Sequence, residues 1–233
     1  SSLMEALCDS GVTNGGREED GIFTCFIKQD NDAEGEYASF DLKELLTDAE
    51  EWNWASAGAF CDEDKGKTYI CYYVFNDLTE AGERDPQLIL VEFDTDQPTN
   101  YRATPYSVEP RDSFSWYCEC YRIDDNLYVA GEETLGVINL STGEFDYCRD
   151  EYALAEEYAQ KVIGEETYYM RTFRAILQQD DMTVYSAEIA EANDSPAVGM
   201  IFVAIRDNQP ISYMSIDLTS EDIGHGVEIE TVE

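Results

Sequence analysis

The chain has 233 residues, with 51 acidic residues against 14 basic ones and a formal net charge of -37. Phosphate groups are bound through Lys and Arg, so we expect neither bare nucleic acid nor an anionic membrane as a partner. Hydrophobic residues make up 43% of the chain and aromatic residues 12%, which is the composition of a globular protein and excludes a disordered acidic chain.

The first third of the chain predicts a short helix followed by strands. Apolar residues predict a helix over Leu3–Cys8, and a polar, glycine-rich stretch follows up to Asp20. The next segment, 42–51, is compatible with a helix and also with a strand that runs into a loop. Strands bounded by Gly, Asp, Asn or Pro are predicted at 21–28, 37–42, 58–62, 68–75, 88–94, 113–122, 126–130, 136–140 and 145–148, with loops at 79–86 and 97–104.

One helix is predicted clearly, at 150–163. Asp150 is placed to cap it, and Gly164 ends it. Further strands are predicted at 167–177, 183–190, 198–206 and 210–218, and an acidic, partly extended tail follows.

These elements predict a mainly β protein built as an antiparallel meander. A hairpin pattern recurs after Asp94, Leu140 and Arg206, which is typical of propeller blades and also of two-sheet sandwiches. Both architectures stay open. We expect an N-terminal segment over 1–20, one β-rich domain over 21–218 with a sub-boundary near the helix, and an acidic C-terminal tail over 219–233.

The seven cysteines are an odd number, so at least one is a free thiol or pairs between chains. Cys118 and Cys120 are two residues apart and share one face of a strand, a spacing that does not suit a zinc site. Cys61 and Cys71 flank a predicted hairpin turn near Gly66. If the turn has three residues these two side chains face each other, so we expect proximity and treat them as a disulfide candidate.

One acidic loop resembles a calcium-binding loop in its spacing. The candidate ligands are Asp30, Asp32, Glu34 and Glu36, with Gly35 at the sixth position. The twelfth position holds Asp41 instead of the usual Glu, and the flanks predict strands instead of helices. An acidic hairpin loop is the competing interpretation.

The sequence offers little for nucleophilic catalysis. His225 is the single histidine, lies between two glycines near the C-terminus, and is expected to be an exposed tail residue. The sequence contains no glycine loop of the phosphate-binding type. A carboxylate pair for sugar hydrolysis is open, and Trp52, Trp54 and Trp116 are candidates for stacking on a sugar, although core or partial-surface packing is the more common explanation for such residues.

Three functions therefore remain. The favoured one is a non-enzymatic binding domain whose acidic surface engages a basic protein partner. The alternatives are a carboxylate-based carbohydrate hydrolase and a DNA mimic that inhibits a nucleic-acid enzyme. We expect no catalytic residue and no cofactor other than calcium, an extracellular or cell-surface location in preference to the cytoplasm, and make no assignment of oligomeric state.

Overall fold

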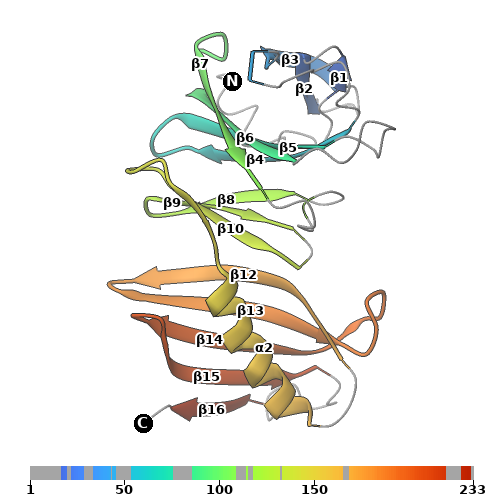
Figure 1. The fold of residues 1–233 in the computed structure, drawn as a ribbon, viewed down its shortest axis with the longest axis vertical. Helices are drawn as coiled ribbons and strands as arrows, with labels where there is room; N and C mark the ends of the chain where they lie inside the picture. The colour runs from blue at the N-terminus through green and yellow to red at the C-terminus, as the bar shows by residue number, and fades with distance from the viewer. Residues whose placement is uncertain are drawn as a thin grey trace. The chain divides into compact units, whose positions relative to one another are not determined.

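The computed structural model describes residues 17–19, 22–28, 34–42, 44–45, 54–75, 86–108, 114, 118–131, 133–164, 168–218 and 227–231. The chain divides into two compact units, 1–122 and 123–233. Within each sheet the strands run antiparallel in chain order, so the predicted mainly β meander is confirmed (Figure 1).

The first unit contains two complete sheets. The smaller sheet consists of β1 (Arg17–Glu19), β2 (Ile22–Lys28) and β3 (Glu34–Asp41). The larger sheet consists of β4 (Trp54–Asp62), β5 (Lys67–Phe75), β6 (Gln87–Asp94) and β7 (Tyr101–Ser107).

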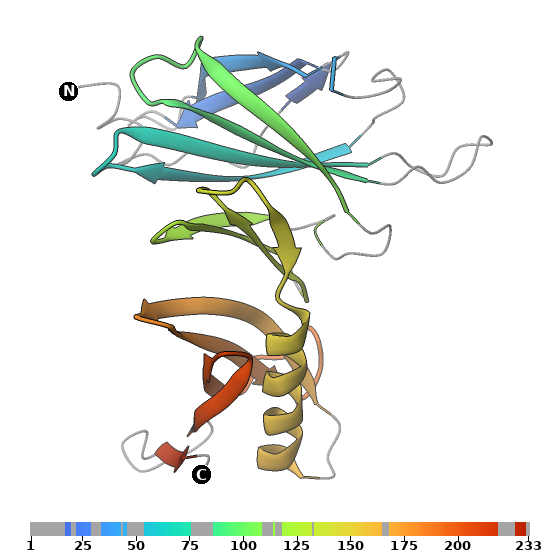
Figure 2. The same cartoon turned by 60° about the vertical axis from the view of Figure 1, so that its left-hand side comes forward.

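The larger sheet is buried on both faces. On one face Ile70, Tyr72 and Val91 pack with Phe40 and Leu42, which come from β3 and the residue after it. Figure 2 shows the β1–β3 sheet lying over this face. Because side chains alternate between faces along a strand, the neighbouring residues Tyr69, Cys71 and Tyr73 lie on the opposite face. These three are buried as well.

That opposite face is covered by the segment that leads into β8 (Glu119–Ile123). A Cβ atom added at Gly58 would lie 2.8 Å from the carbonyl oxygen of Cys118 and 2.8 Å from the amide nitrogen of Cys120. The two backbones therefore nearly touch, and the approach depends on glycine at position 58.

The boundary between the two units falls inside β8. This strand is the last in a four-stranded sheet of order β11-β10-β9-β8. The other strands of that sheet are β9 (Asn126–Ala130), β10 (Leu135–Asn139) and β11 (Phe145–Tyr147). A five-stranded sheet follows with β12 (Tyr169–Gln179), β13 (Met182–Ala190), β14 (Ala197–Arg206), β15 (Gln209–Asp217) and β16 (Val227–Thr231).

Helix α2 (Arg149–Ile163) packs against the five-stranded sheet (Figure 1). Its buried face includes Tyr158, whose ring stacks on Tyr213 of β15 with centroids 4.3 Å apart. Gly164 ends the helix, as predicted, with a positive φ of 81° and an N–H donated to the Gln160 carbonyl. The prediction that Asp150 caps the helix is wrong, because the helix begins one residue earlier and Cys148 occupies the cap position without a side-chain hydrogen bond.

The predicted elements agree with the structure over most of the described chain. The predicted loop at 97–104 is wrong at its end, since β7 begins at Tyr101. Within the strand predicted at 113–122, Phe114 lies in a turn and β8 begins at Glu119. The predicted N-terminal helix, most of the segment 42–51 and the loop at 79–86 lie largely outside the described residues. The division into 1–20, 21–218 and 219–233 stays a prediction.

Candidate functional site

The second unit contains a cleft of about 410 Å³ between helix α2 and the start of β12, which we call the α2 cleft. Its volume lies within the range of pockets that bind small ligands or side chains. The lining residues combine acids with aromatic rings: Glu133, Tyr152, Glu156, Gln160, Tyr168, Tyr169 and Met170.

One wall of the α2 cleft is a single stripe of the helix. Tyr152, Glu156 and Gln160 follow each other at intervals of four residues, and side chains at this spacing lie one above the other on a helix. Glu156 and Gln160 are exposed, while Tyr152 is half-buried. The helix therefore presents a carboxylate and an amide to solvent, with an aromatic ring at one end.

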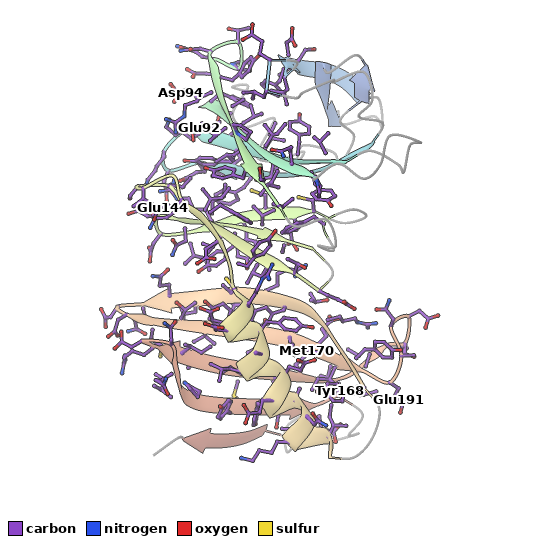
Figure 3. All side chains as sticks on the ribbon, in the orientation of Figure 1. Glu92, Asp94, Glu144, Tyr168, Met170 and Glu191 are labelled. Carbon is purple, nitrogen blue, oxygen red and sulfur yellow. The ribbon has the colours of Figure 1, made fainter. Side chains whose placement is uncertain are left out.

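The facing wall comes from the start of β12. The Tyr168 hydroxyl donates a hydrogen bond of 3.1 Å to the backbone carbonyl of Glu156, which ties this wall to the helix. Met170 is buried and Tyr169 is 43% exposed. Figure 3 shows Tyr168 and Met170 beside α2. Glu133 joins the lining from the turn between β9 and β10, where Gly131 donates its N–H to the Thr134 carbonyl.

Aromatic packing beneath the cleft holds the ring of Tyr152 in place. Its ring meets that of Phe173 edge to face, with centroids 5.3 Å apart. Phe173 in turn stacks on Tyr185 of β13 at 5.2 Å. Such pairs add to the free energy of burial and fix the orientation of the rings.

The electrostatic environment of the cleft is negative. Burial, together with the charges of Glu156 and Glu133, raises the pKa of Tyr152 to about 12. Burial and the Glu156 charge also raise the pKa of Tyr168. Both phenols are therefore neutral at physiological pH, and the same field that disfavours a tyrosinate favours a bound cation.

The arrangement of the α2 cleft suits a cationic group. Among the described residues that line it, none is basic. Aromatic faces attract ammonium and guanidinium groups within about 6 Å of the ring centroid, and carboxylates at the rim add charge-assisted hydrogen bonds. None of these lining residues is among the site residues predicted from the sequence, although the sequence shows the helical spacing of Tyr152, Glu156 and Gln160.

The structure does not bring together the disulfide candidates Cys61 and Cys71. The turn between β4 and β5 has four residues, so Cys61 lies opposite Thr68 and Cys71 lies opposite Gly58. The expected register is wrong by three residues, and a shift by an odd number of residues places the two side chains on opposite faces of the sheet. The Cys61 sulfur contacts Thr68 and Thr95, while Cys71 contacts Cys120 on the other face.

The other predicted site residues are placed only in part. Asp30 and Asp32 lie outside the described residues, and the backbones of Glu34 and Glu36 belong to β3. The calcium site stays a prediction, and no cluster of three or more metal-ligating side chains occurs among the residues whose positions are described. Trp54 belongs to β4, whereas Trp52, Trp116 and His225 lie outside the described part of the chain.

Comparison with protein-family models, with curated proteins and with solved structures finds no match for this chain. Within the described ranges, no helix has both the length and the apolar character that crossing a bilayer requires.

Proposed function

We propose that this protein is a non-enzymatic binding domain whose acidic surface engages a basic protein partner, and that the α2 cleft receives a lysine or arginine side chain of that partner. The observation that carries the proposal is the pairing of Glu133 and Glu156 with three tyrosines in one cleft. The net charge of -37 supports it, because such a field speeds the encounter with a cationic surface and suppresses anionic competitors.

The hydrolase alternative has weaker support from this cleft. Two carboxylates line it, as sugar hydrolysis requires, but the aromatic residues among the described lining are tyrosines and not the tryptophans expected for a sugar platform. We therefore keep the cation-binding function as the single proposal.

The test separates the cleft from the general field of the protein. A fluorescent octalysine peptide is titrated with the wild-type protein and with E133Q/E156Q, and binding is followed by anisotropy at low and physiological salt. Two partly exposed charge contacts are worth about 0.5 kcal/mol each, so we expect about fivefold weaker binding for the double variant. Affinity for every variant should fall as salt rises.

The matched control is E144Q/D207N, which removes the same two charges from elsewhere in the second unit. Glu144 follows β10 at the end away from Glu133, and Asp207 lies in the β14–β15 turn at the far end of the sheet from Tyr169. Figure 3 shows Glu144 well apart from Tyr168. Equally weak binding by both double variants would reject the α2 cleft as the binding site. Binding that does not respond to salt would reject a basic protein as the partner.

The aromatic contribution has its own pair of variants at Tyr169, whose 43% exposure leads us to expect little loss of stability on truncation. Y169A should weaken octalysine binding by about threefold, the loss of one exposed cation–π contact of roughly 0.5–1 kcal/mol. Y169F keeps the ring and should bind like the wild type. If Y169F loses as much affinity as Y169A, the hydroxyl and not the ring face makes the contact.

A further inference from the structure

Two cysteines from distant parts of the first unit meet on the face of the β4–β7 sheet that is covered by the segment leading into β8. Cys71 lies in the middle of β5 and is 0% exposed, and Cys120 in β8 is 5% exposed. The thiol of Cys71 donates to the sulfur of Cys120 at 3.7 Å, across 49 residues of chain. Sulfur atoms at this separation are in van der Waals contact, and a short movement of either side chain would bring them to bonding distance.

The close approach has a cause in the backbone. Stacked layers of sheet are usually about 10 Å apart, too far for two cysteine side chains to meet. Gly58 is the cross-strand neighbour of Cys71, and the backbone of Cys118–Cys120 rests directly on it. Because Gly58 has no side chain, the backbone of β8 can approach the β4–β5 backbone closely enough for the sulfur atoms of Cys71 and Cys120 to be in contact.

We propose that Cys71 and Cys120 form an intrachain disulfide when the chain folds in the presence of a small-molecule disulfide such as oxidised glutathione. One cysteine thiolate attacks glutathione disulfide and expels a glutathione thiolate. The second cysteine thiolate then attacks the mixed disulfide and expels the other. Two S–H bonds are lost and one protein S–S bond forms, while glutathione disulfide takes up two electrons and two protons.

The geometry selects this pair over the other described cysteines. Cys61 lies on the opposite face of the sheet, where its sulfur contacts Thr68 and Thr95. Cys118 shares a face with Cys120, and its sulfur approaches the backbone carbonyl oxygen of Cys71 at 3.8 Å, whereas the sulfur of Cys120 accepts the hydrogen bond of the Cys71 thiol at 3.7 Å.

Burial also sets when the bond forms. The hydrogen bond to Cys120 and complete burial raise the pKa of the Cys71 thiol, and the thiolate is the form that attacks a disulfide. Exchange in the folded protein is therefore slow, and we expect the bond to form while the sheet is assembling and to resist reduction afterwards.

The experiment refolds the wild-type chain from urea in a glutathione redox buffer and maps its disulfides after alkylation of the remaining thiols. Glu119 lies between Cys118 and Cys120, and Glu63 lies between Cys61 and Cys71, so a glutamate-specific protease separates all four. We expect peptide 64–80 linked to peptide 120–132, and a higher urea midpoint for the oxidised than for the reduced protein. A link from 64–80 to any other peptide, or unlinked 64–80, overturns the proposal.

Two variants serve as matched controls for the bond. C118S keeps both proposed partners and should retain the link and the shift in urea midpoint, whereas C120S should lose both. If C120S does not refold, the peptide map of the wild-type protein decides the question alone. A shift in midpoint that persists in folded C120S contradicts the proposal.

Discussion

Cys148 shows how one buried thiol ties stability to pH. Its side chain lies at the start of α2 and is 6% exposed. Burial raises its pKa from the ordinary value of 9.0 to about 12, and the charges of Glu151 and Asp146 contribute in the same direction. The folded state therefore holds the proton more tightly than the unfolded chain does.

We predict an alkaline loss of stability that C148A removes in part. The contribution of Cys148 is complete below pH 9 and is lost as pH rises toward 12, by up to about 1.4 kcal/mol per pH unit. Urea unfolding at pH 8, 9.5 and 10.5 should show a steeper decline for the wild type than for C148A, whatever the absolute cost of the substitution. Parallel declines would contradict the assignment.

At the scale of elements, the junction of β8 with β4 and β5 rests on a buried ion pair. Arg122 of β8 donates to the Asp62 carboxylate at 2.9 Å and to the Tyr69 hydroxyl at 3.1 Å. The side chains of Arg122 and Asp62 are only 8% and 14% exposed. Removing one partner of such a pair leaves the other desolvated, which costs more than the pair itself contributes.

We predict that D62N lowers the free energy of unfolding by about 2 kcal/mol, less than for a fully buried pair because some solvent access remains. D181N is the control, since Asp181 and Arg206 pair at 2.7 Å with side chains 59% and 45% exposed. That exposed pair should contribute under about 1 kcal/mol. Recovery of stability in D62N/R122M relative to D62N would support coupling through the pair, and equal losses in D62N and D181N would contradict it.

How far the sequence predicts these elements depends on how local each signal is. The helix at 150–163 was predicted to within one residue because its apolar spacing and Gly164 are local features. The loop predicted at 97–104 overlaps the first four residues of β7 because that stretch is polar, and an edge strand such as β7 tolerates polar residues and also Pro105. The error at Cys61 and Cys71 came from both the length and the position of the turn, which has four residues at 63–66 instead of three centred on Gly66. The pairing therefore shifts by three residues, which places the two side chains on opposite faces.

The two candidate sites are harder to predict from the sequence than the helices and strands are. The α2 cleft takes residues from a turn, a helix and a strand, and the pairing of Cys71 with Cys120 needs the backbone contact at Gly58. The sequence shows the helical spacing of Tyr152, Glu156 and Gln160, but it reveals neither complete arrangement, because both depend on how separate elements pack. The expectation of a cationic partner comes from composition alone, since 51 acids against 14 basic residues favour a cation in almost any cleft, and it stays a prediction.

At the scale of the whole molecule, the net charge opposes folding. Even if all 14 basic residues were paired, 37 acidic residues would remain without a basic partner. Compaction brings these like charges closer than they are in the unfolded chain, so their mutual repulsion disfavours the folded state. Salt shortens the range of this repulsion to about 10 Å at 0.1 M and about 3 Å at 1 M.

We therefore predict that added sodium chloride stabilises the protein. Between about 10 mM and 0.5 M the urea midpoint should rise, and most of the rise should occur below about 0.2 M, where the screening length changes fastest. Potassium chloride at equal ionic strength should give the same curve, because screening depends on charge and concentration. Sucrose at equal osmolality separates screening from solute exclusion and should have a much smaller effect over this range. A midpoint that stays flat or falls with salt would mean that specific ion pairs, such as that of Arg122 with Asp62, outweigh the general repulsion.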